Sequence, residues 1–260
     1  MNNALIGFSG FVGTTLLKQA QFQALYRSTN IADIEGQTFD TVVCAGAPAQ
    51  KWIANREPEA DRLKIEGLIS HLKTLKCRRF ILISTVDVFK SSVGVDEDSP
   101  VDESGLHAYG LNRRLLEKFV EAHFPEHLIV RLPGLVGPGL RKNVIFDFLN
   151  DNNLHAIDSR GVFQFYPMIN LWFDIQLAIE AGIKLVHLTA QPVSVAAIAK
   201  DGFAREFANA LDNPVGFYDM QTRYANVFGG EGRYQYSLRE TLLAVRAYAQ
   251  SEPRGALVKS

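Results

Sequence analysis

Short apolar runs alternate with longer amphipathic segments through the first half of the chain. Five of these runs are continuous and rich in β-branched residues, as expected of strands buried on both faces of a parallel sheet; they cover residues 4–8, 24–27, 41–45, 80–85 and 128–132. Between them, apolar residues recur every three or four positions, which predicts helices over residues 11–21, 57–76 and 109–123. The alternation predicts an α/β fold with a doubly wound parallel sheet and right-handed crossovers.

The pattern changes after residue 133, where glycine and proline cluster over residues 134–139. We therefore expect an N-terminal domain of residues 1–133, a smaller C-terminal lobe of residues 134–250 and a polar tail of residues 251–260. Within the lobe, strand patterns at 162–166 and 185–188 are mixed with helical patterns at 143–149, 171–181, 195–210 and 238–249.

Composition narrows the classes of protein that the chain can belong to. Of its 260 residues, 47% are apolar, which is enough for a large core, and the formal net charge of −1 argues against nucleic-acid and membrane partners. No apolar run reaches the roughly 18 residues that span a bilayer, and the first residues do not look like a signal peptide. We expect a soluble, cytoplasmic protein whose two cysteines, Cys44 and Cys77, are reduced thiols.

A glycine-rich loop follows the first predicted strand and leads into the first predicted helix. Glycines in this place permit a tight turn and a close approach of backbone N–H groups to a pyrophosphate, and the helix N-terminus attracts the anion. The loop predicts a dinucleotide site formed by Gly7, Ser9, Gly10, Phe11, Val12 and Gly13. Its spacing is G-x-x-G-x-x-G rather than G-x-G-x-x-G, so a glycine-rich turn without a ligand stays open. A hydrolase nucleophile elbow and an NTPase phosphate loop both fail on the residues that follow.

The end of the second predicted strand bears on the choice of cofactor. It carries no Asp or Glu where a NAD site would hold the ribose hydroxyls, but ends in Arg27 and Ser28. Both side chains can bind a 2′-phosphate, which favours NADP and leaves NAD open. A solvated arginine is the alternative.

Four further segments, in order along the chain, resemble one known family. They are Cys44-Ala45-Gly46-Ala47, the strand end Ser84-Thr85-Val86-Asp87-Val88-Phe89, Tyr109-Gly110-Leu111-Asn112-Arg113, and Arg131-Leu132-Pro133 with Gly137-Pro138-Gly139. With the glycine loop, they resemble the extended short-chain dehydrogenase/reductases, also called the NAD-dependent epimerase/dehydratase family. Within it, the short first unit, Asp33-Ile34 and Glu57-Pro58-Glu59-Ala60 are most similar to dehydrorhamnose-type reductases of nucleotide-linked sugars.

The resemblance implies a Rossmann domain with catalytic residues at the edge of its sheet. Tyr109 matches the family's general acid/base and Thr85 the hydroxyl that orients the substrate oxygen, while Arg113 stands where the family has Lys. A phenol with a pKa near 10 needs a neighbouring cation to act near neutral pH, and one helical turn brings Arg113 close to Tyr109. Arginine keeps the charge but changes the hydrogen-bonding geometry toward a nicotinamide ribose. Packing roles for Tyr109 and Thr85, and a solvated Arg113, are the alternatives.

The same resemblance implies that the cofactor contacts Asp33, Ala45, Gly46, Ala47, Ser84 and Pro133. Arg141 and Asn143 follow the Gly-Pro-Gly turn and are expected to meet an anionic nucleotide-sugar diphosphate. Tyr166 is expected to contact the substrate, with packing in the core of the lobe as the alternative. No metal is expected, because Pro125 separates His123 from His127 and ends the helix that would place both on one face.

Together these observations predict an NAD(P)-dependent oxidoreductase or epimerase that acts on a keto or hydroxyl group, with a nucleotide-linked sugar as the expected substrate. A catalytically weak or inactive NADP(H)-binding sensor or scaffold is the rival, and Arg113 is its best support. The substrate, the direction of reaction and the oligomeric state, a homodimer included, stay open.

Overall fold

The computed structural model describes residues 2–255, so most of the expected polar tail lies outside the described residues. The chain forms two compact units that interleave along the sequence. Unit 1 comprises Met1–Ser91, Glu97–Leu132 and Leu171–His187; unit 2 comprises Ser92–Asp96, Pro133–Asn170 and Leu188–Ser260. The chain passes from unit 1 to unit 2 at Pro133, next to the change in the sequence pattern. It returns to unit 1 between residues 171 and 187.

A six-stranded parallel sheet forms the centre of unit 1, in the order β10-β6-β4-β3-β1-β2. Its strands are β1 (Asn3–Ile6), β2 (Ala24–Tyr26), β3 (Thr38–Cys44), β4 (Lys76–Thr85), β6 (His127–Leu132) and β10 (Leu185–His187). The predicted doubly wound parallel sheet is confirmed. The pattern at 185–188 was expected in the smaller lobe, but β10 pairs with β6 and extends this sheet.

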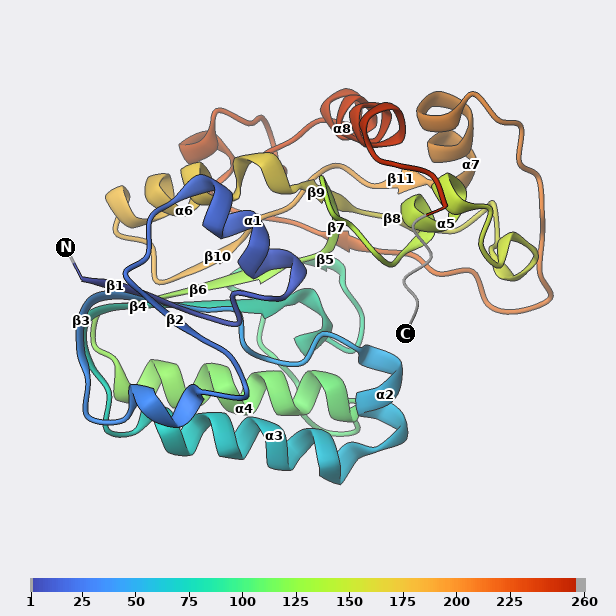
Figure 1. The fold of residues 1–260 in the computed structure, drawn as a ribbon. Coiled ribbons are helices and arrows are strands. Elements are labelled where there is room, and N and C mark those ends of the chain that lie inside the picture. The colour runs from blue at the N-terminus through green and yellow to red at the C-terminus, as the bar shows by residue number, and fades with distance from the viewer. Residues whose placement is uncertain (1, 256–260) are drawn as a thin grey trace. The chain divides into compact units, whose positions relative to one another are not determined.

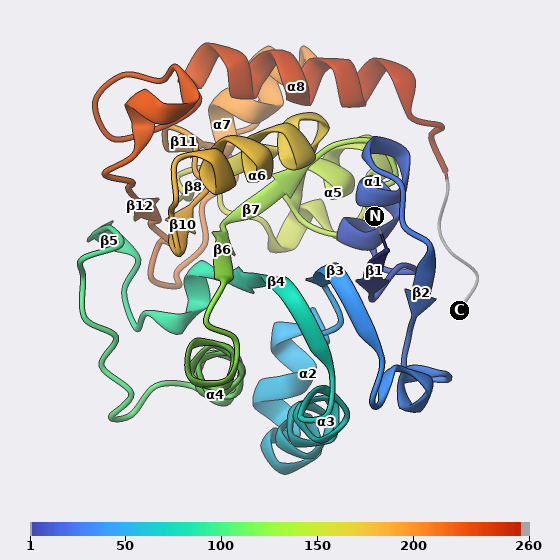
Figure 2. The ribbon, with the colours of Figure 1, turned by 90° about the vertical axis from the view of Figure 1, so that its left-hand side faces the viewer.

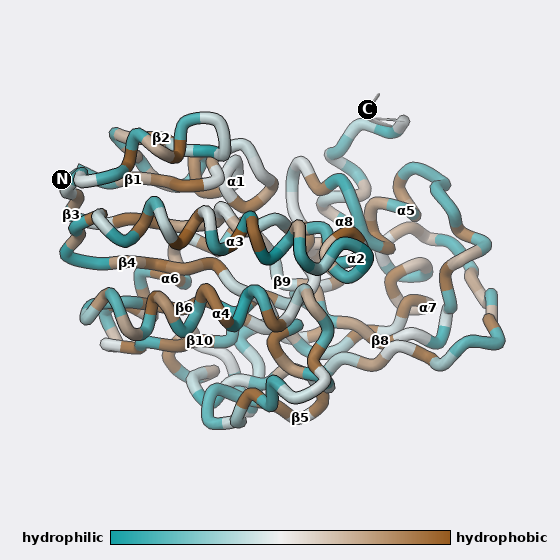
Figure 3. The backbone as a smooth tube through the Cα atoms, turned by 90° about the horizontal axis from the view of Figure 1, so that it is seen from below, coloured by the Kyte–Doolittle hydropathy of each residue, from teal (hydrophilic) through white to brown (hydrophobic). Residues whose placement is uncertain are grey.

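Helices cover both faces of the sheet (Figures 1 and 2): α1 (Phe11–Gln19) and α6 (Leu171–Glu180) lie on one face, α3 (Pro58–Leu72) and α4 (Ala108–His123) on the other. Viewed from the side of α3 and α4, the strands appear as apolar tracts behind helices that alternate polar and apolar segments (Figure 3). The core between them contains Val42, Ile65, Leu82, Leu116 and Ile129, all 0–1% exposed. This burial is the physical reason for the two patterns that predicted the elements.

The predicted helix over residues 57–76 is α3 in the structure, and it is preceded by a helix that the sequence did not predict, α2 (Lys51–Arg56). Pro58 occupies the first turn of α3, and Glu57 before it has φ −127° and ψ 64°. A residue that precedes proline is sterically disfavoured from helical geometry, so the break falls at Glu57. The apolar spacing of α3 did not reveal α2, which is too short for a periodic pattern.

Apart from the helix α8, the elements of unit 2 are short. Its strands form three pairs: β7 (Gly134–Val136) with β9 (Phe165–Pro167), β8 (Val162–Phe163) with β11 (Val193–Ser194), and β5 (Val93–Val95) with β12 (Asp219–Met220). Its helices are α5 (Val144–Asn150), α7 (Val195–Ala197) and α8 (Leu238–Ser251), and a π-helical turn, Ile198–Gly202, follows α7. The helix expected over residues 195–210 therefore ends early, at Gly202, whereas α8 begins with a complete capping box of Ser237 and Glu240.

The strand order reverses direction at β1, which has β2 on one side and β3 on the other. In open α/β sheets, ligands bind outside the carboxyl ends of the strands at such a switch point. In unit 1 this point lies between the loop that follows Ile6 and the loop that follows Cys44.

Candidate cofactor and catalytic site

At two positions of the first loop, the backbone geometry leaves no room for any residue but glycine. Gly7 has φ +84°, and a Cβ atom on it would lie 2.3 Å from the carbonyl oxygen of Ala45. A Cβ on Gly13 would lie 2.1 Å from the carbonyl oxygen of Gly7. The loops after β1 and β3 also touch directly, since the Ala45 amide donates to the Ile6 carbonyl at 2.9 Å. The two predicted cofactor segments therefore meet at the switch point.

Gly10 differs from its two neighbours. It is the N-cap of α1, and a Cβ atom on it would have only the Gly7 carbonyl oxygen within 4 Å, at the ordinary contact distance of 3.5 Å. Helix α1 has no side-chain cap and no acidic residue in its first turn. An exposed helix N-terminus without a side-chain cap suits an anion, so the loop fits the diphosphate of a dinucleotide.

Arg27 follows β2 and stands beside this loop. Its guanidinium carbon lies 5.7 Å from the centre of the Phe8 ring, and its Nε donates to the Thr29 hydroxyl at 3.0 Å. The Gly7 amide donates to the carbonyl of Tyr26, so the strand end and the glycine loop are joined. Arg27, like the adjacent Ser28, is exposed, as a residue that binds a phosphate must be in the free protein.

Asp33 lies in a short 3₁₀ turn after Arg27. The turn covers Ile31–Ile34, and Asp33 is exposed within it. Its charge, after the effect of burial, raises the pKa of Tyr26, which ends β2. Asp33 therefore belongs to the same end of the sheet as the glycine loop.

Thr85 and Tyr109 come together at the carboxyl end of β4. The Thr85 hydroxyl accepts the Asp87 amide at 3.1 Å and caps the 3₁₀ turn Val86–Val88. It also interacts with the Tyr109 phenol and lowers its pKa, as does the charge of Arg113. Burial outweighs both, however, and the pKa of Tyr109 is raised above its usual value. The sequence predicted the neighbouring cation, Arg113, but not that burial of the phenol would raise its pKa.

Arg113 is not a solvated helix charge, because only 3% of it is exposed. Its guanidinium forms a buried ion pair with Asp61 of α3 and donates to the carbonyl oxygen of Pro48. The guanidinium carbon lies 4.0 Å from the centre of the Tyr109 ring, so the charge faces the ring rather than the hydroxyl alone. Asn112 also donates to Asp61, at 2.8 Å. In this arrangement Arg113 is committed to protein partners.

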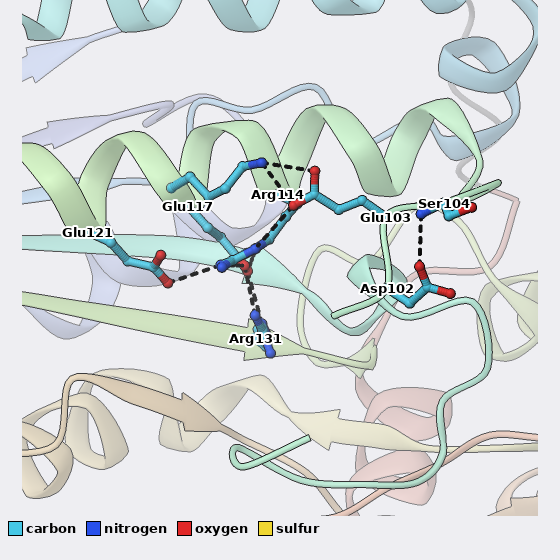
Figure 4. A network of polar contacts seen from close by, with 9 residues as sticks. Asp102, Glu103, Ser104, Arg114, Glu117, Glu121 and Arg131 are labelled. Carbon is cyan, nitrogen blue, oxygen red and sulfur yellow. Dashed lines mark hydrogen bonds and ion pairs between the residues drawn. The ribbon is translucent and has the colours of Figure 1, made fainter. Parts of the chain in front are cut away.

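Ser84 has different neighbours from Thr85, although the two are adjacent on β4. Its hydroxyl donates to Glu117 at 2.6 Å. The same carboxylate accepts from Arg131 at 3.0 and 2.8 Å and from Arg114 at 2.9 Å, and Figure 4 shows these two arginines around it. Burial would raise the pKa of Glu117, which is 0% exposed, but its arginine and serine partners lower it below the usual value. Ser84 thus takes part in a buried ionic network between β4, β6 and α4.

Three residues at the site were not foreseen from the sequence. Lys51 of α2 binds the Asp87 carboxylate, with 2.7 Å between Nζ and Oδ1. His107 is the N-cap of α4, and its Nδ1 accepts the Gly110 amide at 3.0 Å. Only His107 carried a signal, namely its place just before a helical pattern; Lys51 and Asp87 lie far apart in sequence and meet only in the fold.

The expected substrate residues belong to unit 2. Asn143 has the left-handed φ of +101° and caps α5, with Oδ1 accepting the Ile145 amide at 2.9 Å and Nδ2 donating to Leu135 at 2.8 Å. Tyr166 is fully buried and packs edge-on against Tyr236. Arg141 is exposed. The side chains of Asn143 and Tyr166 therefore stabilise unit 2 itself, whereas Arg141 is exposed to solvent.

Pro133, the last of the expected cofactor residues, lies at the start of unit 2 and is partly buried. The Ala45, Gly46 and Ala47 segment is partly buried at the end of β3. A Cβ on Gly46 would approach the side chain of Ile6 to 2.9 Å, which again indicates close packing between the ends of β1 and β3.

Both cysteines, Cys44 and Cys77, are free in the structure. Within residues 2–255, no group of three or more His, Cys, Asp or Glu side chains could hold a metal ion. Burial raises the pKa of Cys44 to about 11 and that of Cys77 to about 12, so both are thiols at neutral pH. Over the same described range, no helix is long and apolar enough to cross a membrane.

Comparisons with known proteins find similar structures but no similar sequences. No protein-family model and no curated protein matches the chain. A dTDP-4-dehydrorhamnose reductase from Bacillus anthracis, solved with NADP, is 15% identical, with 95% of this chain and 98% of that chain covered and a TM-score of 0.72. A UDP-glucose 4-epimerase from Thermotoga maritima, solved with UDP-glucose, is 16% identical over 96% and 97%, with a TM-score of 0.71. TunA, an NAD-dependent NDP-hexosamine 5,6-dehydratase, is 16% identical over 97% and 99%, with a TM-score of 0.73.

The likeness is one of fold. It extends over nearly the whole chain, and the reductase is of the enzyme type that the sequence motifs resemble. At such low identity the chemistry has to be argued from this chain's own residues.

Proposed function

We propose that unit 1 binds NADP(H) across the glycine loop. The observation that carries this proposal is the difference among three glycines: Gly7 and Gly13 have no room for a side chain, whereas Gly10 is exposed and has room for a Cβ at the uncapped start of α1. The diphosphate would bind the backbone N–H groups of this loop. Arg27, beside Phe8, would bind the 2′-phosphate, which favours NADP over NAD.

The proposed reaction is the oxidation, reduction or epimerisation of a keto or hydroxyl group. The cofactor, when bound, would supply or accept a hydride. Tyr109 would hold the proton at the reacting substrate oxygen, and Thr85 would orient that oxygen. Because the raised pKa keeps the phenol protonated at neutral pH, the resting site would act first as an acid.

The proposed substrate is a nucleotide-linked sugar. Neighbours in structure are described as an epimerase with UDP-glucose and a dTDP-sugar reductase, which makes this class the first to test. Arg141 is exposed on unit 2 and carries the charge that a sugar-nucleotide diphosphate would need.

A second candidate is a protein that binds the dinucleotide without turnover. The buried pairing of Arg113 with Asp61 and Pro48 favours it, because a cation held there is not free to bind the nicotinamide ribose. Both candidates share the same cofactor loop.

Turnover of nucleotide-linked keto-sugars, followed by NADPH absorbance, separates the two candidates. We expect Tyr109→Phe to lower the rate about a hundredfold or more with cofactor affinity nearly unchanged, because the variant loses the transferable proton and keeps the ring. A substrate that the Tyr109→Phe variant converts at the wild-type rate would exclude the catalytic role. Tight NADPH binding without turnover of any sugar nucleotide would favour the second candidate.

A further inference from the structure

Two ion pairs, each joining an acidic residue to a basic one, contribute charges that act on the Tyr109 phenol. The Arg113–Asp61 pair is buried, with side chains 3% and 5% exposed. The Lys51–Asp87 pair is more open, with side chains 39% and 19% exposed. Because an ion pair near solvent can form and break at low cost, the second pair is the adjustable one.

Asp87 connects the open pair to the reacting groups. Its amide donates to the Thr85 hydroxyl, the same hydroxyl that interacts with the Tyr109 phenol. Its carboxylate is bound by Lys51. An unneutralised carboxylate in this position would oppose the formation of a phenolate, by the ordinary repulsion of like charges.

Helix α2 holds Lys51 in place through contacts with the segments around it. The Asn55 side chain accepts the Tyr109 amide at 3.0 Å, and the Pro48 carbonyl, just before α2, accepts from Arg113. Helix α2, through Asn55, and the segment before it, through Pro48, are therefore both bound to the part of α4 that carries the phenol. These contacts fix the backbone from which the Lys51 side chain reaches Asp87.

We propose that Lys51 is a positioning residue for the Tyr109–Thr85 pair: its ammonium neutralises the Asp87 carboxylate and thereby keeps the phenol able to ionise. The use of that phenol as an acid/base rests on the proposed function. The effect of the Lys51 and Asp87 charges on the ionisation of the phenol does not. Lys51 thus supplies part of the effect expected from Arg113, whose own charge is balanced by Asp61.

The other charged groups that face the phenol do not replace Lys51. Arg113 from α4 lowers the pKa of Tyr109, but it stays paired with Asp61 from α3. Burial and the charge of Lys51 lower the pKa of His107, which precedes α4, so this imidazole is neutral at pH 7. The Asp87 carboxylate acts in the opposite sense and raises the pKa of Tyr109.

The test is a pH titration of the apoprotein labelled with 3-fluorotyrosine and followed by ¹⁹F NMR. The fluorinated phenol is more acidic than tyrosine's, which keeps the titration within the pH range of the folded protein. Of the eight tyrosine signals, the one absent from Tyr109→Phe identifies the residue. Lys51→Met should raise the titration midpoint of the Tyr109 signal by about 0.5 pH units or more, and Asp87→Asn should lower this midpoint by a similar amount.

Two further variants distinguish charge from structure. The double variant Lys51→Met with Asp87→Asn should return the midpoint close to that of the wild type, and Lys51→Arg should leave it unchanged. Equal midpoints in the folded wild type, Lys51→Met and Asp87→Asn proteins would overturn the proposal. The titration uses neither cofactor nor substrate, so a failure of the proposed reaction would leave this result intact.

Discussion

The glycine loop and the start of α4 are two halves of the same candidate site, and they are specified in different ways. In the loop, Gly7 and Gly13 are fixed by backbone atoms 2.1–2.3 Å from where a side chain would begin. At the start of α4, Tyr109 and Arg113 adjoin as their spacing requires, but the partners of Arg113 come from α3 and from the segment before α2. A local motif can therefore specify the backbone conformation of a binding loop. The role of a charged side chain, in contrast, depends on residues distant in sequence.

The largest expected effect tests the backbone half of this comparison. Gly13→Ala should lower the free energy of unfolding by about 4 kcal/mol or more, because its Cβ would overlap the Gly7 carbonyl and neither backbone can yield. Gly10→Ala is the matched control and should change stability by less than about 1 kcal/mol. Urea denaturation measures both. Equal stabilities of the two variants would mean that the loop is not packed as described.

The next effect tests the side-chain half. Asp61→Ala should lower the free energy of unfolding by about 3 kcal/mol, because it leaves the buried Arg113 charge without its partner. Replacing both residues, as Asp61→Leu with Arg113→Met, should recover most of this loss, since no buried charge then remains unpaired. Thermal and urea unfolding give the two values. If Asp61→Ala is as stable as the wild type, Arg113 is not committed to α3.

A smaller effect concerns the choice between the two dinucleotides. Arg27→Ala should narrow the preference for NADP over NAD by roughly tenfold or more, because a charge-assisted contact with the 2′-phosphate is lost. Ser28→Ala offers a milder comparison at the adjacent position. Affinities for both cofactors, measured by calorimetry, decide the matter. Equal affinity of the wild type for NADP and NAD would show that Arg27 has no part in selection.

Much of the fold of unit 1 could be predicted from the sequence. Buried parallel strands are continuous apolar runs, and all five that were predicted occur with ends shifted by a few residues. The return of α6 and β10 to unit 1 could not be predicted, because a short strand pattern does not reveal its pairing partner. Nor could the short α2, which lacks the length for periodicity.

The candidate site was foreseen less completely than the fold. The glycines were found because their role is conformational, and Thr85 and Tyr109 because the resemblance supplied them. Lys51 and Asp87 were missed, since charged residues look alike in sequence whether they are solvated or paired at a site. Ser84 and Thr85 show the same difficulty: they are adjacent, yet one binds the buried Glu117 and the other faces Tyr109.

The most direct test of the central claim is an isothermal calorimetric titration of NADPH into the wild type and into Gly10→Val. The Gly10 position has space for a side chain in the free protein, so the variant should fold normally, while the branched side chain fills the place that the diphosphate would occupy. We expect the wild type to bind NADPH and the folded Gly10→Val variant to lose at least about a hundredfold in affinity. Equal binding by the two folded proteins would contradict the assignment of this loop as the cofactor site.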